Sequence, residues 1–221
     1  PKYRWQGKPL NSGNIATFNE YAIVSENRVT PIPNDFPMEI APFLGCAVTT
    51  GLGVVTNNAQ LKIGESLVIF GAGGVGLNVI QGANLAGAHP IVAIDLVNER
   101  LEMATKFGAT HQFNSKECDI REEVINIVGK QGADVIVDNT GNTDVIQLAY
   151  ALTQPQGRTI LVGVPRAGDD ISIYSLPLHF GKVLTGSHGG ETNPSQDIPK
   201  YIRLFEADKL ELRALLTDRF Q

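Results

Sequence analysis

From Ser66 onward, short apolar runs alternate with longer stretches that have a helical period. The apolar runs predict six strands, at 67–71, 91–95, 112–114, 135–138, 159–164 and 183–187. The stretches between them predict helices over 75–87, 97–107, 119–129 and 142–152, with 173–180 as a further candidate. Apolar runs without polar alternation are typical of strands covered on both faces, as in a parallel sheet. The pattern therefore predicts an α/β fold, in which a doubly wound sheet of six parallel strands matches a Rossmann domain.

The two flanks of this unit follow other patterns. Residues 1–34 are rich in Gly, Asn and Pro, which predicts irregular β structure whose pairing partners lie elsewhere. Prolines at 31, 33 and 37 argue against helix there, whereas 38–59 are mostly apolar and compatible with helix. A last helix is expected over 195–207.

A glycine-rich turn follows the first predicted strand of the regular unit. It reads Gly71-Ala72-Gly73-Gly74-Val75-Gly76, a G-x-G-x-x-G pattern between a strand and a helix. Gly71 permits the tight turn, Gly73 lets the backbone approach a pyrophosphate, and Gly76 allows close helix–sheet packing. The N–H groups of the helix start would then face the phosphates.

An acidic residue stands where a dinucleotide site needs one. Asp95 ends the next predicted strand and follows Gly76 by 19 residues, close to the spacing of about 20 for a ribose-binding carboxylate. Such a carboxylate accepts hydrogen bonds from ribose hydroxyls and repels a 2′-phosphate, which favours NAD over NADP. Arg100 nearby is a residue that would tolerate a phosphate.

Two other interpretations of the glycine turn stay open. The turn could pack a helix on the sheet without binding any ligand. It could also belong to a methyltransferase that binds S-adenosylmethionine, although such enzymes usually carry an acid just before the glycine loop, where Phe70 stands here.

Composition and charge exclude several classes. The 221 residues carry a net charge of −5 with no basic tract, which disfavours a nucleic-acid partner. No apolar run approaches the roughly 18–20 residues of a membrane span. Cys46 and Cys118 occupy unrelated contexts, so we expect no disulfide and a cytoplasmic location. Because the chain starts at Pro1 and stops soon after an apolar stretch, we expect both ends to be incomplete.

Cys46 is the one candidate metal ligand with a motif around it. By composition alone, a single cysteine at an apolar helix start is most often a buried small hydrophobe. A catalytic zinc needs three protein ligands, and the histidines, at 89, 111, 179 and 188, are scattered along the chain.

Four motifs in order give the chain a family resemblance: Phe18-Asn19-Glu20-Tyr21, the stretch from Gly45 to Gly53, the loop from Gly71 to Gly76, and Gly163-Val164-Pro165. Together they resemble the zinc-dependent alcohol dehydrogenases of the medium-chain dehydrogenase/reductase superfamily. The likeness is greatest to the class III branch, which oxidises a thiol adduct of formaldehyde, and it covers essentially the whole chain.

The resemblance implies roles for particular residues. Cys46 matches a ligand of the catalytic zinc, and both Cys46 and Thr50 match catalytic positions. Zinc binding at Cys46 is conditional on the family's other ligands, which belong to an N-terminal stretch absent from this sequence. Asp95 matches the ribose-binding acid, and Arg100 a basic residue beside the adenosine. The remaining matches are to cofactor-binding positions: Thr50, Gly51, Gly71, Gly73, Gly74, Val75, Gly76, Thr140, Gly141, Val162, Gly163 and Val164.

The resemblance also implies an organisation and a function. Residues 1–60 would be part of a GroES-like β catalytic domain with a connecting helix, 61–190 the Rossmann domain, and 191–221 a return segment. We expect an oxidoreductase that transfers hydride between an alcohol, or an aldehyde–thiol adduct, and NAD. Residues 171–187 would build the subunit interface of a homodimer or homotetramer. A stand-alone NAD-binding module and a zinc-free quinone or enoyl reductase of the same superfamily remain the alternatives.

Overall fold

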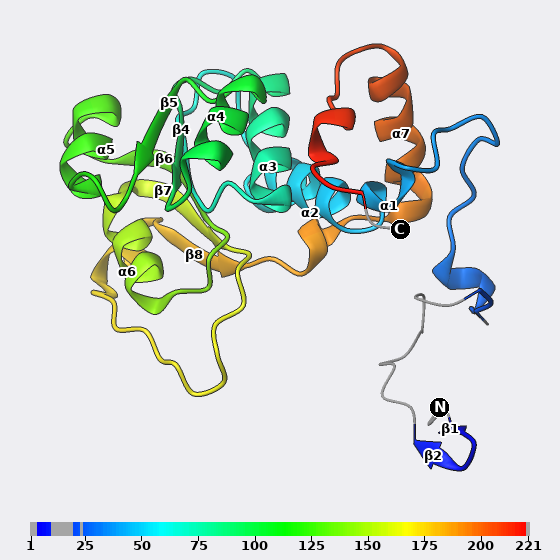
Figure 1. The fold of residues 1–221 in the computed structure, drawn as a ribbon. Coiled ribbons are helices and arrows are strands. Elements are labelled where there is room, and N and C mark those ends of the chain that lie inside the picture. Colours follow the sequence, from blue (N-terminus) through cyan, green and yellow to red (C-terminus); the bar gives the residue numbers. More distant parts are fainter. Residues whose placement is uncertain (1–3, 10–19, 23, 220–221) are drawn as a thin grey trace.

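A computed structural model describes residues 4–9, 20–22 and 24–219. Its centre is a sheet of six parallel strands in the order β5-β4-β3-β6-β7-β8 (Figure 1). The strands are β3 (Leu67–Phe70), β4 (Ile91–Asp95), β5 (His111–Asn114), β6 (Ala133–Asp138), β7 (Thr153–Leu161) and β8 (Val183–Gly186). In chain order this is the 3-2-1-4-5-6 arrangement of a Rossmann sheet, so the predicted fold class is confirmed.

Helices cover both faces of the sheet because each central strand is apolar on both sides. They are α3 (Gly74–Leu85), α4 (Asn98–Lys106), α5 (Ile120–Val128) and α6 (Thr143–Leu152). In β3, Leu67 and Ile69 belong to one buried cluster and Val68 and Phe70 to another. This alternation follows from the two-residue period of a strand.

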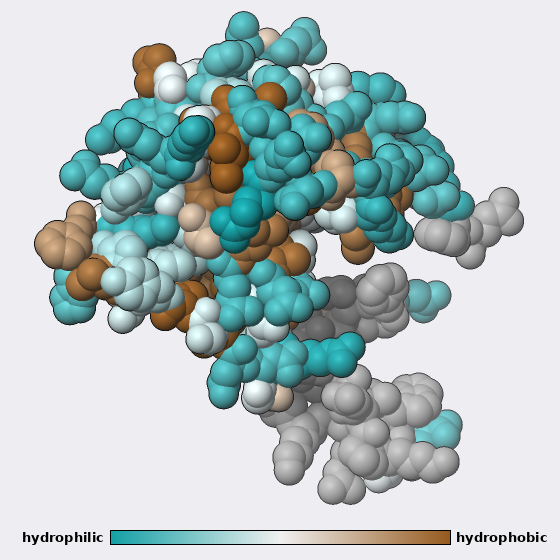
Figure 2. Space-filling view, turned by 90° about the vertical axis from the view of Figure 1, so that its left-hand side faces the viewer, coloured by the Kyte–Doolittle hydropathy of each residue, from teal (hydrophilic) through white to brown (hydrophobic). Residues whose placement is uncertain are grey.

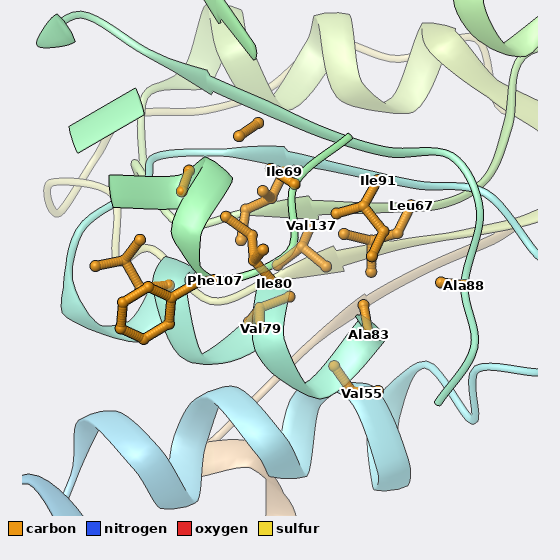
Figure 3. Close-up of a cluster of buried hydrophobic side chains, with 14 of the residues drawn as sticks. Val55, Leu67, Ile69, Val79, Ile80, Ala83, Ala88, Ile91, Phe107 and Val137 are labelled. Carbon is orange, nitrogen blue, oxygen red and sulfur yellow. The ribbon is translucent and has the colours of Figure 1, made fainter. Parts of the chain in front are cut away.

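The first of these clusters forms the larger part of the core. Val79, Ile80 and Ala83 of α3 pack against the strand residues Leu67, Ile69, Ile91 and Val137 (Figure 3). Val55, which precedes the sheet in sequence, closes the cluster from the outer side of α3. The helix that begins at the glycine turn is therefore fixed on both of its sides.

Side-chain caps fix where α5 and α6 begin. Asp119 accepts hydrogen bonds from the N–H groups of Arg121 and Glu122, and starts α5. Asn142 accepts from Asp144 and Val145, and starts α6. Asp and Asn are preferred N-caps because their oxygens satisfy N–H groups that have no partner within the helix.

Two elements differ from the predicted ones. The strand expected over 159–164 is β7, which starts earlier, at Thr153, and stops at Leu161, because a register shift opposite Ala133 and Val135 lengthens its pairing with β6. The helix candidate over 173–180 is a 3₁₀ helix, η3 (Leu176–Phe180). It ends after five residues because Gly181 adopts a left-handed conformation, with φ of 98°.

The segments that precede and follow the sheet strands in the sequence are largely helical, and they pack on each other. Before it lie η1 (Glu26–Arg28), α1 (Ala41–Leu44), α2 (Ala47–Gly53) and the π-helix η2 (Val54–Asn58); after it lie η4 (Gly189–Glu191), α7 (Pro194–Glu206) and η5 (Arg213–Leu215). Ile40 and Leu44 share a buried cluster with Ile198, Tyr201 and Leu212. The helices expected within 38–59 and over 195–207 are thus present, and they meet.

The start of the described chain differs from the prediction of partners elsewhere. β1 (Arg4–Trp5) and β2 (Lys8–Pro9) pair with each other as an antiparallel hairpin. Residues 18 and 19 of the Phe18–Tyr21 motif lie outside the described residues.

The outer surface around α5 and α6 is mostly polar, with apolar side chains gathered in a few tracts (Figure 2). Within the described ranges, no helix is long and apolar enough to cross a membrane.

Candidate functional site

The glycine turn lies at the carboxyl edge of the sheet, between β3 and α3. β3 ends at Phe70, α3 begins at Gly74, and Gly71 between them has φ of 95°, a conformation that glycine adopts without strain. A Cβ at position 76 would overlap the carbonyl oxygen of Gly71. Both predicted reasons for glycine, the tight turn and the close packing, are therefore visible in the backbone.

Gly73 has open space in front of it. It is the N-cap of α3 and has no side-chain cap, and a Cβ there would meet no atom within 4 Å. It lines two adjacent cavities, of about 360 Å³ and about 510 Å³. A helix start with N–H groups directed at such a space is suited to hold a phosphate, so these residues fit the pyrophosphate of a dinucleotide.

Asp95 lies at the end of β4, on the wall of the larger cavity. Its side chain is only 6% exposed. Oδ2 accepts a hydrogen bond of 2.7 Å from the N–H of Ala72, and Oδ1 accepts from Leu96 at 2.7 Å and Val97 at 3.1 Å. The carboxylate is thus held from two sides, by the glycine turn and by its own strand end.

Arg100 comes from the first turn of α4 and is half exposed. Its Nη1 lies 3.7 Å from Oδ2 of Asp95, and it lines both cavities beside Gly73. The structure therefore brings together the glycine turn, the acid and the base that the sequence predicted.

The opposite wall of the larger cavity comes from the loop after β6. Asn139, Thr140 and Asn142 line it, together with Val145 in the first turn of α6. Gly141 faces a third cavity, of about 480 Å³, that it shares with Val164. The predicted residues Thr140 and Gly141 thus lie at the same edge of the sheet as Asp95, as expected for the carboxyl ends of parallel strands.

Residues 162–164 lie just beyond the strand in which they were expected. The N–H groups of Val162 and Gly163 both donate to the carbonyl oxygen of Asp138, at 2.8 Å and 3.0 Å. Val164 is exposed, at 89%. The loop after β7 therefore lies against the loop after β6.

Asp138 is a residue that our sequence reasoning did not single out. It is fully buried, and its carboxylate accepts three hydrogen bonds, from Thr140 and Gly141. The available signal was an acid directly after the apolar run Val135-Ile136-Val137 and two residues before Thr140-Gly141.

Thr50 and Gly51 lie in α2, which packs on α3. Both are buried, and a Cβ at Gly51 would overlap the side chain of Asn78 and the carbonyl oxygen of Val75. The first residue of α2, Ala47, lines the smaller cavity beside Gly73 and Gly74. These predicted residues are therefore gathered near the glycine turn.

Cys46 precedes α2 and is exposed, so the compositional expectation of a buried cysteine was wrong. The reason is its position as the N-cap, where the chain turns out of α1 before the buried face of α2 begins. Among the residues that the structure describes, no group of three His, Cys, Asp or Glu side chains could hold a metal ion. The described residues thus do not fit a zinc site by themselves, since a single cysteine provides one ligand of the three required.

Comparison with known proteins agrees with this geometry. The model of the family described as "Zinc-binding dehydrogenase" matches residues 74–207. An S-(hydroxymethyl)glutathione dehydrogenase of Paracoccus denitrificans is 36% identical over 209 residues, which are 91% of this chain and 56% of that protein. The enzyme of the same name from Saccharomyces cerevisiae is also 36% identical, over 92% of this chain and 54% of its own length.

Solved structures show the same relationship. Benzyl alcohol dehydrogenase from Acinetobacter calcoaceticus superposes with a TM-score of 0.87 at 30% identity, over 92% of this chain and 56% of that one. The chain therefore spans somewhat more than half the length of the relatives it matches. Because the family model covers more than half of the chain and the sheet order, glycine turn and acid agree with it, this chain belongs to the zinc-binding dehydrogenase family.

Proposed function

We propose that this chain is the cofactor-binding portion of an NAD-dependent, zinc-containing alcohol dehydrogenase. The observation that carries the proposal is the Asp95 carboxylate, which is buried at the end of β4 and faces the same cavity as Gly73. The names of the relatives, alcohol dehydrogenase class-3 and S-(hydroxymethyl)glutathione dehydrogenase, support an alcohol or an aldehyde–thiol adduct as the substrate.

Asp95 has room for one ribose hydroxyl. An ionised carboxylate offers about four acceptor positions, and backbone N–H groups use three of them. The fourth, on Oδ2, is free to accept from a ribose. A 2′-phosphate there would face a buried negative charge, which only Arg100, at 3.7 Å, would partly offset. This asymmetry supports NAD over NADP.

Around the phosphates and the nicotinamide, the backbone of this chain does most of the binding. Gly73, Gly74, Val75 and Gly76 would offer N–H groups to the pyrophosphate. Residues 50–51, 140–141 and 162–164 would border the nicotinamide and fix its orientation. Bound there, NAD supplies a hydride acceptor, and the protein supplies its position and excludes water.

Cys46 would be one zinc ligand in the complete enzyme, with the others from residues outside those described. Because Cys46 is exposed beside the start of α2, its thiol is accessible to a zinc ion. Zinc analysis of the natural full-length protein tests this. Wild-type protein is expected to hold at least one zinc per chain, and Cys46→Ser to hold one fewer.

We further propose that residues 1–60 and 191–221 belong to a second domain, flanking the Rossmann domain at 61–190. The shared cluster of Ile40 and Leu44 with Tyr201 and Leu212 supports this division. We also propose a cytoplasmic location for the protein, because Cys46 and Cys118 are both free thiols.

We also propose a homodimer or homotetramer whose interface includes 171–187. β8 is an edge strand of the described sheet, and the exposed apolar side chains within 171–187 are those of Tyr174, Leu176, Leu178, Phe180 and Val183. An edge with such side chains favours association with another chain.

The experiment for the main proposal is a fluorescence titration of the natural full-length protein with NADH, followed by an assay with alcohols. Binding of NADH with alcohol oxidation supports the proposal. Binding of NADH without oxidation of any alcohol indicates a cofactor-binding module, and NADPH-dependent reduction of a quinone by zinc-free protein indicates the reductase alternative. A protein that binds neither cofactor would show the proposal to be wrong.

A further inference from the structure

Asp138 holds the loop that follows its own strand. It ends β6, and its side chain is fully buried. Oδ1 accepts hydrogen bonds from the N–H of Thr140 at 3.1 Å and from its hydroxyl at 2.6 Å, and Oδ2 accepts from the N–H of Gly141 at 3.0 Å. Three bonds from one carboxylate fix the turn at 140–141.

The same residue holds the loop that follows the next strand. Its carbonyl oxygen accepts from the N–H groups of Val162 and Gly163. The side chain of Asp138 thus organises one loop of the site, while its main chain organises the other.

The two loops pack closely against each other at Gly141 and Gly163. Gly141 has φ of 69°, and a Cβ there would lie 2.6 Å from the carbonyl oxygen of Val164. A Cβ at Gly163 would overlap the backbone nitrogen of Gly141. Because packed interfaces of this kind do not deform continuously, a shift of the 140–141 turn must displace residues 162–164 as well.

A chain of hydrogen bonds also connects Asp138 to residues that line the larger cavity. The hydroxyl of Thr140, which donates to Asp138, accepts from the N–H of Asn142 at 3.1 Å. Asn142 in turn caps α6 through Asp144 and Val145. Thr140, Asn142 and Val145 line the larger cavity, whereas Asp138 lines none of the cavities described above.

We propose that Asp138 is a positioning residue for the cofactor: its buried carboxylate sets the relative placement of the 139–142 and 162–164 loops, and through them the affinity for the dinucleotide. The inference rests on the proposed function of the site. It adds a residue that touches neither cofactor nor substrate but on which both walls of the site depend.

The test uses the natural full-length protein and two matched variants of strand β6. Asp138→Asn replaces one acceptor oxygen by a donor, which would face the N–H of Gly141. Asp134→Asn makes the same change at the other end of the strand, where Asp134 accepts from the N–H and hydroxyl of Ser66 and from Gln154. Both variants lose partly buried hydrogen bonds, but only Asp138 is linked to the site.

We expect Asp138→Asn to weaken NADH binding about tenfold, the usual size of a lost bond to a charged group, and to raise KM for NAD by a similar factor. kcat at saturating NAD is expected to fall by a smaller factor than KM rises, because the displaced loops act first on binding and only secondarily on the orientation of the nicotinamide. Asp134→Asn is expected to lower the melting temperature about as much as Asp138→Asn does. It is expected to leave NADH affinity within about twofold of wild type.

Equal NADH affinity in the two variants would overturn the inference, and so would a fall in kcat with KM unchanged. If Asp138→Asn does not fold, Thr140→Val and Thr140→Ser decide. Thr140→Val removes the hydroxyl and is expected to weaken NADH binding several-fold, whereas Thr140→Ser keeps the hydroxyl and is expected to bind NADH as tightly as wild type. Equal NADH affinities of these two variants would overturn the inference. Wild-type protein that binds no NADH would overturn the proposed function and this inference together, a result distinct from the preceding ones.

Discussion

Oδ2 of Asp95 accepts a 2.7 Å hydrogen bond from the backbone N–H of Ala72. The bond joins the acid that ends β4 to the glycine turn that follows β3, so the parts of the site that we propose to bind ribose and phosphate are held in fixed relative positions. This contact shows how a carboxylate that lies 19 residues after Gly76 in the sequence comes to lie beside the glycine turn.

Removal of the Asp95 charge is expected to relax the choice of cofactor. Asp95→Asn keeps the shape of the side chain but ends the repulsion of a 2′-phosphate, and the ratio of NADPH to NADH affinity should rise about tenfold or more. Fluorescence titration with both cofactors measures it. Asp119→Asn is the control, because it makes the same charge change at the cap of α5, where Asn is an equally good N-cap; an unchanged ratio in Asp95→Asn would contradict the assignment.

Gly76→Ala is expected to destabilise the fold at the glycine turn. The new Cβ would overlap the carbonyl oxygen of Gly71, and relief of such overpacking costs about 1–3 kcal/mol. Urea denaturation measures the loss. Gly74→Ala is the control for folding, since its Cβ would lie at an ordinary 3.7 Å from that of Ala47; equal stability of the two variants would argue against the close packing.

The ion pair of Glu65 and Arg158 makes stability depend on acid pH. Burial raises the pKa of Glu65, but a bidentate hydrogen bond from Arg158, the N–H of Lys62 and the guanidinium charge together lower it below 4.5. A lowered folded-state pKa stabilises the protein above the unfolded value and ceases to do so as pH falls through the folded one. The stability difference between wild type and Glu65→Gln should therefore be largest near neutral pH and shrink below about pH 4.5.

Urea denaturation at pH 7 and at successively lower pH values tests this dependence. Glu102→Gln, a change at an exposed position of α4, serves as the control. A difference for Glu65→Gln that is constant from pH 7 to pH 3 would refute the role of the ion pair.

Tyr201 is expected to limit stability at alkaline pH. Burial in the cluster with Ile40, and secondarily the charge of Asp197, raise its pKa to about 12 from 10. Because the unfolded chain ionises this phenol first, stability should fall as pH rises above about 10. Tyr201→Phe should lessen that fall, whereas Tyr21→Phe, at an exposed position, should not; denaturation curves from pH 9 to 12 that are the same for all three proteins would disprove the effect.

The proposed subunit contact predicts a change of mass. Phe180→Asp, at a side chain that is 71% exposed beside the edge strand β8, should convert the natural protein to monomers. Ile63→Asp, at an 89% exposed apolar residue before β3, should leave the assembly intact. Light scattering coupled to size-exclusion chromatography distinguishes the two, and an unchanged mass for Phe180→Asp would exclude this edge.

The sequence predicted the sheet well because its central strands are apolar on both faces. Leu67 and Val68 point to opposite faces and both are fully buried, as the unbroken apolar run predicted for an interior strand of a parallel sheet. The acid and the glycine turn were predictable because each role demands one residue type at one spacing.

Other features depend on contacts that no local pattern encodes. The end of β7 is set by pairing with β6 and β8, and the N–H groups of Val162 and Gly163 turn instead to Asp138. Cys46 is exposed because the chain turns at that residue, although its neighbours are apolar. Asp138 resembles any other strand-end acid until its three donors are seen together.

The cluster that joins Ile40 and Leu44 to Ile198, Tyr201 and Leu212 has a consequence for biosynthesis. On a ribosome, the early residues emerge more than 150 positions before the partners that cover them. The six-stranded sheet can form in that interval, since its strands lie between the two halves of the cluster. During translation, Ile40 and Leu44 therefore lack these partners until α7 and Leu212 emerge, and apolar side chains exposed for such a period are prone to aggregation.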